Sequence, residues 1–340
     1  MFVLIVGSTE LSTIPGLSAA GADLETLPYT APTDADLLWW GKPRVIGHIP
    51  LDPQGHPTPA IITRAAYLEA HFPLSILRAG TIIPPQAPYI DTGAFPGKDP
   101  TREPAVPQAH ELFIRGQELA EDLSSDQEPL VIAESVPGGT TTAALVLEAL
   151  GYSGAVSSSG PDNPKEIKQR ITAQAFDRLG WSTGIMAGRG LESVSQLGDP
   201  MQPLAAGLAA GAPKGIQVVL AGGTQMLAVA AILRHEGCDR PLTVATTCYV
   251  HRDVSADFDG IARDVDVHPW SAPLDFRQSA WPGLRGYEQG YVKEGVGAGG
   301  AVWYAQHLGV SVYAVIRRTE LIYSAMAETY LKGTPTSRTI

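Results

Sequence analysis

Basic residues and long hydrophobic runs are both scarce in this chain of 340 residues. Its 24 Lys and Arg stand against 35 Asp and Glu, so the formal net charge is −11, and no cluster of five or more basic residues occurs. Because nucleic-acid binding needs a basic patch, we expect no nucleic-acid partner. No apolar run approaches the length of a membrane span, so we expect no membrane partner either.

Cysteine is almost absent, and the two that occur, Cys238 and Cys248, show no CxxC spacing. We expect both to be buried free thiols in a reducing cytosol. The first residues, 1–7, are apolar but only about one strand long, without a basic segment or a cleavage site. They indicate a first β-strand rather than a signal peptide, so the expected location is the cytoplasm.

Motifs of several well-known chemistries are missing too. The eight histidines show no HExxH or other ligand spacing, so we expect no metal site. No GxSxG element presents a nucleophilic serine, and no Gly-Lys-Ser/Thr follows a glycine turn as in a Walker loop. We expect no cofactor, and only small-molecule substrates as ligands.

What is present is a globular α/β pattern, with 44% hydrophobic and 17% charged residues. Strands are predicted at 2–6, 45–49, 129–133, 154–158, 216–221 and 242–250, and helices at 60–70, 108–122, 143–150, 165–179, 226–235 and 315–332. The stretch 73–107, rich in Pro and Gly, predicts long loops. Strands that alternate with helices predict right-handed βαβ units and a parallel, Rossmann-like sheet flanked by helices.

The length exceeds the usual size of one core, so a subdomain is expected. We predict a single α/β domain over 1–340, with a smaller loop-rich and helical part at about 50–125 and C-terminal helices at about 285–332.

The segment 133–142 is the most informative motif. Glu134 ends a buried strand, a Pro-Gly-Gly turn follows, and three threonines open an apolar helix. A glycine turn that leads into a helix N-terminus directs backbone N–H groups and the positive end of the helix dipole at one spot, which suits a phosphate. The predicted phosphate ligands are Gly138, Gly139, Thr140, Thr141 and Thr142. The alternative is a capped turn without a ligand, with Thr140 as the N-cap.

A second turn of this kind, Gly222-Gly223-Thr224, follows the strand at 216–221 and has the same two interpretations. Parallel sheets bind ligands at the carboxyl ends of their strands. We therefore expect the loops 134–142, 222–225 and 246–253 to meet there, on a rim that suits a phosphorylated sugar. Within the third loop, His251 and Arg252 could equally make structural hydrogen bonds.

Glu294 lies in a third glycine-rich segment, where Gly295 and Gly297 permit close approach of a ligand and the carboxylate could act as a general base. The alternative is a solvated loop acid. The glycines at 295, 297 and 300 also match G-x-G-x-x-G, but the preceding residues do not resemble a strand, which disfavours a dinucleotide site.

Together these three elements resemble the nicotinate-nucleotide:dimethylbenzimidazole phosphoribosyltransferase family of cobalamin biosynthesis. The bacterial enzymes carry a related Gly-Asn-Thr-Thr turn and a Glu-Gly-x-Gly-Ala element. The less characterised archaeal and cyanobacterial branch is more similar, over nearly the whole chain. The segments that carry this second resemblance are 6–10, 14–21, 55–59 and 156–159.

The resemblance implies a homodimer that transfers 5-phosphoribose from nicotinate mononucleotide to a nitrogen base. It implies that Glu294 is the general base and that Glu134 lies beside the ribose or the base. It also implies that residues 138–142 hold the phosphate and that residues 222–224 form the nucleotide rim. The N-terminal region does not match the part that binds dimethylbenzimidazole in the bacterial enzymes, so the acceptor stays open between dimethylbenzimidazole, adenine and similar bases.

Two other functions remain as alternatives. A nucleotide-binding sensor would need the phosphate turn but not Glu294. A nicotinamide-dinucleotide oxidoreductase would use the glycines at 295–300.

Overall fold

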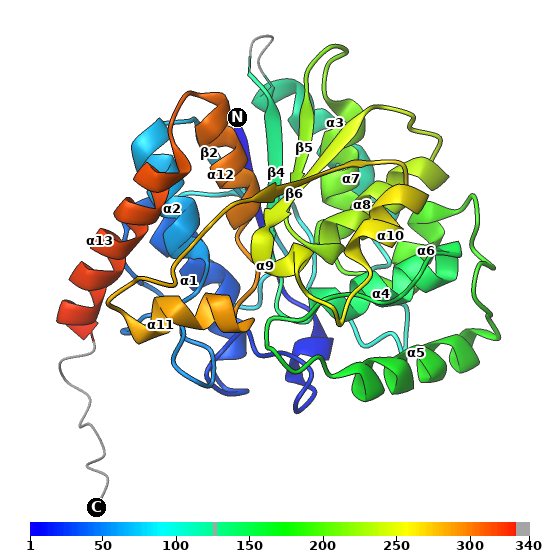
Figure 1. Cartoon of the computed structure of the whole chain (residues 1–340). Helices are drawn as coiled ribbons and strands as arrows, with labels where there is room; N and C mark the ends of the chain where they lie inside the picture. The colour runs from blue at the N-terminus through cyan, green and yellow to red at the C-terminus, as the bar shows by residue number, and fades with distance from the viewer. Residues whose placement is uncertain (125–127, 331–340) are drawn as a thin grey trace, which may run out of the picture.

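A seven-stranded parallel sheet forms the centre of the molecule (Figure 1), as seen in a computed structural model that describes residues 1–124 and 128–330. Its order is β3-β2-β1-β4-β5-β6-β7. The strands are β1 (Phe2–Gly7), β2 (Leu74–Ala79), β3 (Ile90–Asp91), β4 (Leu130–Ser135), β5 (Val218–Ala221), β6 (Leu242–Thr247) and β7 (His268–Ala272). This confirms the α/β fold with a parallel, Rossmann-like sheet.

Helices cover both faces of the sheet (Figure 1). One face carries α1 (Leu27–Trp40), α2 (Ala60–Ala70), α11 (Pro282–Arg285), α12 (Ala298–His307) and α13 (Val312–Tyr330). The other face carries α3 (Ala109–Leu123), α4 (Gly139–Leu150), α5 (Lys165–Leu179), α6 (Gly190–Leu197), α7 (Met201–Gly211), α8 (Thr224–His235) and α10 (Phe258–Asp264), and the short α9 (Cys248–His251) follows β6. The chain also forms two 3₁₀ turns, η1 (Glu10–Thr13) and η2 (Gly286–Gln289).

Alternation along each strand divides the core into two halves. In β1, Val3 and Ile5 join the cluster beneath α3–α8, whereas Phe2, Leu4 and Val6 join the cluster beneath α1, α2 and α12. Successive strand side chains point to opposite faces, so a strand covered on both sides must be apolar throughout. This explains the continuous apolar runs from which the sequence predicted β1, β4 and β5.

Helices α3 and α7 pack so closely that their backbones are in contact. A Cβ added to Gly207 would overlap with the carbonyl oxygen of Phe113, and one added to Gly116 would overlap with that of Leu204. The two helices therefore approach more closely than any larger residue at these positions would permit.

Two predicted strands are wrong. Residues 45–49 form no strand, because the Val45 N–H donates to Asp36 Oδ2 (3.0 Å) and the segment wraps around the end of α1 instead. Residues 154–158 are extended but unpaired. Both edges of β4 are already occupied by β1 and β5, and the Ser157 N–H donates to Thr224 Oγ1 (3.2 Å).

Other elements escaped prediction. The stretch 73–107 is not all loop, because it contains β2, which pairs with β1, and β3. Helix α1 was missed because Pro28 and Pro32 obscure its period, although Pro28 occupies the first turn, where proline is tolerated. Strand β6 ends at Thr247, and residues 248–250, which were predicted as strand, form α9. The final predicted helix corresponds to α13, and residues 331 and 332 lie outside the described part.

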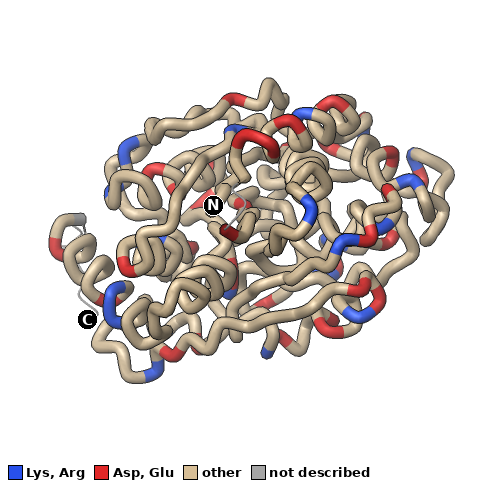
Figure 2. The backbone as a smooth tube through the Cα atoms, turned by 90° about the horizontal axis from the view of Figure 1, so that it is seen from above, with Lys and Arg blue, Asp and Glu red and all other residues tan. Residues whose placement is uncertain are grey.

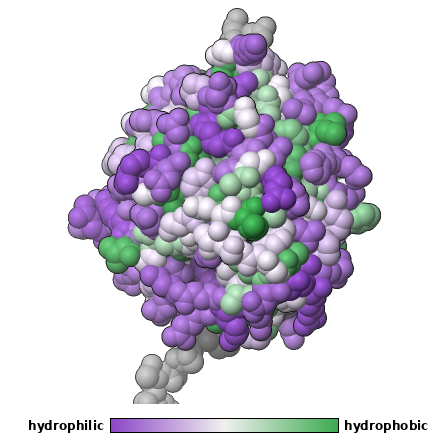
Figure 3. Space-filling view, turned by 90° about the vertical axis from the view of Figure 1, so that its right-hand side faces the viewer, coloured by the Kyte–Doolittle hydropathy of each residue, from purple (hydrophilic) through white to green (hydrophobic). Residues whose placement is uncertain are grey.

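The views in Figures 2 and 3 show no large patch of one charge or of hydrophobic side chains. Lys and Arg are interspersed with Asp and Glu along the tube in Figure 2, and the hydrophobic side chains on the face in Figure 3 form separate spots among hydrophilic ones. None of the helices in the described residues is long and apolar enough to cross a membrane. Both cysteines are free thiols, but Cys238 is only half-buried, whereas Cys248 is buried as expected.

We predict that Gly207→Ala lowers the free energy of unfolding by about 1–3 kcal/mol, because the added methyl forces α3 and α7 apart. Denaturant unfolding measures this directly. Gly47→Ala is the control, because an added Cβ there meets nothing within 4 Å, and it should shift stability by less than about 0.5 kcal/mol. Equal midpoints for the two variants would contradict the close-packing argument.

Candidate functional site

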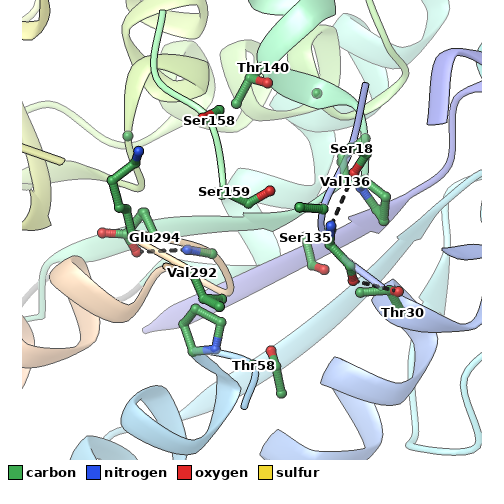
Figure 4. A pocket seen from close by; sticks show the side chains of 18 of the residues that line it. Ser18, Thr30, Thr58, Ser135, Val136, Thr140, Ser158, Ser159, Val292 and Glu294 are labelled. Carbon is green, nitrogen blue, oxygen red and sulfur yellow. Dashed lines mark hydrogen bonds between the residues drawn. The ribbon is translucent and has the colours of Figure 1, made fainter. Parts of the chain in front are cut away.

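A cavity opens at the carboxyl ends of β1, β4, β5 and β6 (Figure 4). It lies where the strand order reverses, between β1 and β4, the usual ligand position in open α/β sheets. Eight of the residues predicted for the site line it: Glu134, Gly138, Gly139, Thr140, Gly223, Thr224, Glu294 and Gly295. Three separate loops therefore meet there, as the sequence predicted for 134–142 and 222–225, with 246–253 contributing Val250.

The turn before α4 is shaped by glycine. Gly138 has φ of 85°, a conformation that favours glycine, and a Cβ added to Gly139 would overlap with the amide of Gln225. The turn thus carries the chain into α4 with its N-terminus facing the cavity. Thr140 supplies the hydroxyl at this point, and Figure 4 shows it beside Ser158.

The other two threonines do not line the cavity. The Thr142 hydroxyl donates to Asp199 Oδ2 and to the Gly139 carbonyl, which ties α4 to the N-terminus of α7. Thr141 is fully buried, and its hydroxyl has no hydrogen-bond partner among the described residues. Consecutive residues on a helix point in directions about 100° apart, so three in a row cannot all face one ligand. Thr141 and Thr142 were predicted as phosphate ligands, but neither contacts the cavity.

The turn before α8 supplies a second helix N-terminus. Gly223 faces the cavity, and a Cβ added there would meet Val250 only at 3.6 Å. Thr224 Oγ1 accepts a hydrogen bond from the Ser157 N–H, so this hydroxyl positions the 157–159 loop. Gly222 precedes Gly223 with a φ of 159° and does not line the cavity.

Glu134 lies at the end of β4, only 3% exposed. Its Oε2 accepts from the Val136 N–H (3.1 Å) and from the Gln225 side-chain amide (3.2 Å). Burial raises the pKa of Glu134 well above its usual range, and the nearby charges of Glu294 and Asp199 add to the effect.

Glu294 is held by donors on both oxygens. Its Oε2 accepts from the Thr247 N–H (2.7 Å) and the Thr246 hydroxyl (3.1 Å), and its Oε1 accepts from the Gly295 (3.2 Å) and Gly299 (3.3 Å) N–H groups. Desolvation raises the pKa of Glu294 to about 7, although these bonds to the charged form lower it. The group is therefore oriented and ready to exchange a proton near neutral pH.

The remaining glycines of this segment pack α12 against the sheet. A Cβ added to Gly297 would overlap with Ala133 on β4, and one added to Gly300 would overlap with Ala221 on β5. Gly297 is absent from the cavity lining. Within the described residues the segment follows η2 and a loop rather than a strand, so the dinucleotide alternative lacks its structural context.

Sequence reasoning missed several polar groups of the cavity. Asp34 of α1 is 3% exposed and lines the wall, where it accepts from the hydroxyls of Thr58 (2.7 Å) and Ser135 (2.8 Å). Asp52 also lines the wall and pairs with His56 (2.8 Å). The available signal for Asp34 was a pair of aspartates, Asp34 and Asp36, directly before the apolar residues 37–40.

Two buried lysines stand behind the 157–160 loop. Lys293 pairs with Asp253 (3.0 Å) and donates to the Gly160 carbonyl, and Lys168 donates to the Ser157 carbonyl (2.7 Å). Burial lowers the pKa of Lys168 to about 7, and the charge of Lys293 adds to the effect. Lys293 is the only lysine that lines the cavity among the described residues.

The remaining candidates lie elsewhere. His251 is within 3.4 Å of Asp259, Arg252 is within 3.9 Å of Glu288, and neither lines the cavity. No group of three or more His, Cys, Asp or Glu that could hold a metal ion occurs in residues 1–124 and 128–330.

Solved structures with this fold include a nicotinate-nucleotide-dimethylbenzimidazole phosphoribosyltransferase and CobT, both from Thermus thermophilus. Their TM-scores are 0.59 and 0.58 at 15% sequence identity, over 95% of this chain and 82% and 83% of theirs. The likeness confirms the fold that the sequence resemblance implied. No protein-family model matches the chain.

Relatives in sequence include several archaeal proteins. A UPF0284 protein of Pyrococcus furiosus is 49% identical over 325 residues, covering 95% of this chain and 98% of its own. The corresponding proteins of Thermococcus kodakarensis and Halobacterium salinarum are 47% and 41% identical, over 95% and 93% of this chain and 96% and 95% of theirs. As the resemblance to an archaeal branch predicted, the chain has its relatives there, and it belongs to the UPF0284 family.

Proposed function

We propose that this protein transfers 5-phosphoribose from nicotinate mononucleotide to a nitrogen base, for assembly of the lower ligand of a cobamide. The products are an α-ribosyl nucleotide and nicotinate. The observation that carries the proposal is the position of Glu294, a carboxylate held by four donors, in one cavity with two helix N-termini. The fold shared with the phosphoribosyltransferases supports it.

The phosphate binds at the N-termini of α4 and α8 in this proposal. Gly138, Thr140 and Gly223 line that part of the cavity, where the dipoles of two helices converge. Glu134 lies close by, bonded to the Val136 N–H and to Gln225, and its raised pKa reduces the repulsion that a phosphate would meet there.

The chemistry needs one proton to be removed. The bond between the ribose C1′ and the nicotinate nitrogen breaks, and its electron pair goes to that nitrogen, which neutralises the pyridinium. A ring nitrogen of the incoming base bonds to C1′, and the base gives its N–H proton to Glu294. Because the leaving group carries its own positive charge, the protein supplies positioning and a base rather than acid catalysis.

Glu134 stabilises positive charge on the substrate in this scheme. It lies at the end of β4, and its raised pKa means that a positive charge must favour the ionised form. The pyridinium of the donor and the charge that develops on the ribose supply that charge, and the carboxylate stabilises it. Its bond to Gln225 fixes the side chain in place.

The first experiment incubates the purified protein with nicotinate mononucleotide and either dimethylbenzimidazole or adenine, and measures released nicotinate by chromatography. Base-dependent release is expected. Tight binding of nicotinate mononucleotide without release in the presence of any base would instead favour a nucleotide sensor, which needs the helix N-termini but not Glu294.

We predict that Glu294→Gln lowers kcat by about 10²–10⁴-fold, because the amide cannot take the proton. Calorimetry should show a dissociation constant for nicotinate mononucleotide within a few-fold of the parent value, since the amide keeps the size of the side chain and leaves the N-termini of α4 and α8 unchanged. A variant with the parent kcat would refute the role of Glu294.

The pH profile gives an independent test of the same group. Glu294 must be ionised to act, and its pKa is about 7, so kcat/KM should rise with pH through about 7 and be lost as pH falls below it. The residual kcat/KM of Glu294→Gln should not show this rise with pH. A parent profile that stays flat from about two pH units below that pKa to about two units above it would contradict a base with this pKa.

We predict that Gly223→Ala weakens binding of nicotinate mononucleotide by about tenfold or more. The new methyl has room in the protein, since its nearest neighbours are 3.6 Å away at Val250, but it projects into the space that the phosphate would occupy. Titration calorimetry measures the loss, and Gly47→Ala serves again as the matched control. Unchanged affinity with an unchanged unfolding midpoint would show that the phosphate binds away from α8.

A further inference from the structure

Asp34 is a buried carboxylate without a cationic partner on the wall of the cavity. It accepts two hydrogen bonds, both from neutral hydroxyls, one on each oxygen. No ion pair of Asp34 occurs among the described residues, and no nearby positive charge offsets its burial. A carboxylate has about four acceptor sites, so part of its capacity remains unused at the cavity wall.

Such a group is unfavourable unless something uses that capacity. Burial raises the pKa of Asp34 to about 7 even though both hydroxyl bonds lower it. Thr58 and Ser135 hold the carboxyl group in place from the loop before α2 and from the end of β4. A ligand that brings N–H donors would complete the hydrogen bonding and favour the charged form.

The position of Asp34 indicates which part of a ligand it meets. The helix N-termini that suit a phosphate belong to α4 and α8, on one face of the sheet, whereas α1 and α2 cover the other face. Glu294 lies at the entry to α12, which packs against α2 on that second face. In Figure 4, Thr140 and Ser158 lie at one side of the cavity and Thr30 and Thr58 at the opposite side.

Apolar side chains make up much of the cavity lining. They include Leu17, Pro50, Leu51, Pro59, Val292 and Val296. Apolar walls with a polar group at the far edge suit a planar ring that presents hydrogen-bond donors along one side.

We propose that Asp34 is the specificity-determining residue for the acceptor base, and that it accepts hydrogen bonds from an exocyclic amino group. The inference rests on the proposed transferase function and names the substrate class of the same site. The acceptor is then an amino-substituted nitrogen heterocycle such as adenine. One ring N–H loses its proton to Glu294, and the amino group bonds to Asp34. A base without an amino group, such as dimethylbenzimidazole or unsubstituted purine, leaves Asp34 unsatisfied.

The test compares two bases that differ by one amino group, adenine and purine, at saturating nicotinate mononucleotide. In the parent protein, kcat/KM should favour adenine by about tenfold or more, since a hydrogen bond to a charged group is lost with purine. Asp34→Asn should reduce that ratio by a similar factor, because the amide presents a donor where the amino group needs an acceptor. Equal kcat/KM values for the two bases in the parent would overturn the proposal, whatever happens to the variant.

A second measurement separates acceptor recognition from donor recognition. Asp34→Asn should leave the dissociation constant of nicotinate mononucleotide within a few-fold. A tenfold loss of nucleotide affinity with an unchanged adenine-to-purine ratio would place Asp34 on the donor and overturn the proposal.

The two proposals fail in different ways. If no base releases nicotinate, the transferase function fails, and calorimetry of adenine and purine against the nucleotide-loaded protein still tests Asp34. Preferential binding of adenine that is lost in Asp34→Asn would then support base recognition in a binding protein, and equal binding of the two bases would overturn it.

Discussion

The cluster of three carboxylates around the end of β4, two of them buried and Glu294 partly exposed, is the constraint on which the site depends. Glu134, Glu294 and Asp34 all line one cavity, and the charges of Glu294 and Asp34 both raise the pKa of Glu134. Like charges in a desolvated site oppose ionisation, so each group must be offset by donors. The fold supplies backbone N–H groups for Glu294, an amide for Glu134 and hydroxyls for Asp34. Asp34 is the one of the three whose donors are all neutral hydroxyls, without an N–H group.

The glycines around α12 make this arrangement possible. Glu294 receives N–H bonds from Gly295 and Gly299 because the chain turns sharply into the helix there. The helix can then lie directly on the strands, since Gly297 and Gly300 contact β4 and β5 where a side chain would not fit. Much of the glycine pattern that resembled a ligand-binding loop is therefore a packing requirement. It acts on the site indirectly, by bringing Glu294 to the carboxyl ends of β4 and β6.

The fold could be predicted largely because strands covered on both faces must be apolar, and this signal survives in a single sequence. Residues 154–158 have the right composition for a strand, but no free sheet edge is available beside β4, which only the three-dimensional arrangement reveals. Residues 45–49 bond to α1, a helix that its prolines concealed, and the same helix carries Asp34. One missed element therefore explains both a wrong strand and a missed site residue. Glu134 and Glu294 were predictable, since an acidic residue next to a sharp glycine turn is a signal that local sequence encodes.

The charge distribution of the cavity limits what it can bind. Glu134, Glu294 and Asp34 line it, and Lys293, the one lysine in the lining among the described residues, is paired with Asp253. The turns before α4 and α8 direct backbone N–H groups into the same space. A nucleotide that joins an anionic phosphate to a pyridinium nitrogen offers a partner to both kinds of group. When the C–N bond breaks, the pyridinium nitrogen becomes neutral, and the carboxylates face the positive charge on the ribose and the proton of the incoming base, so they stabilise the transition state more than the bound donor.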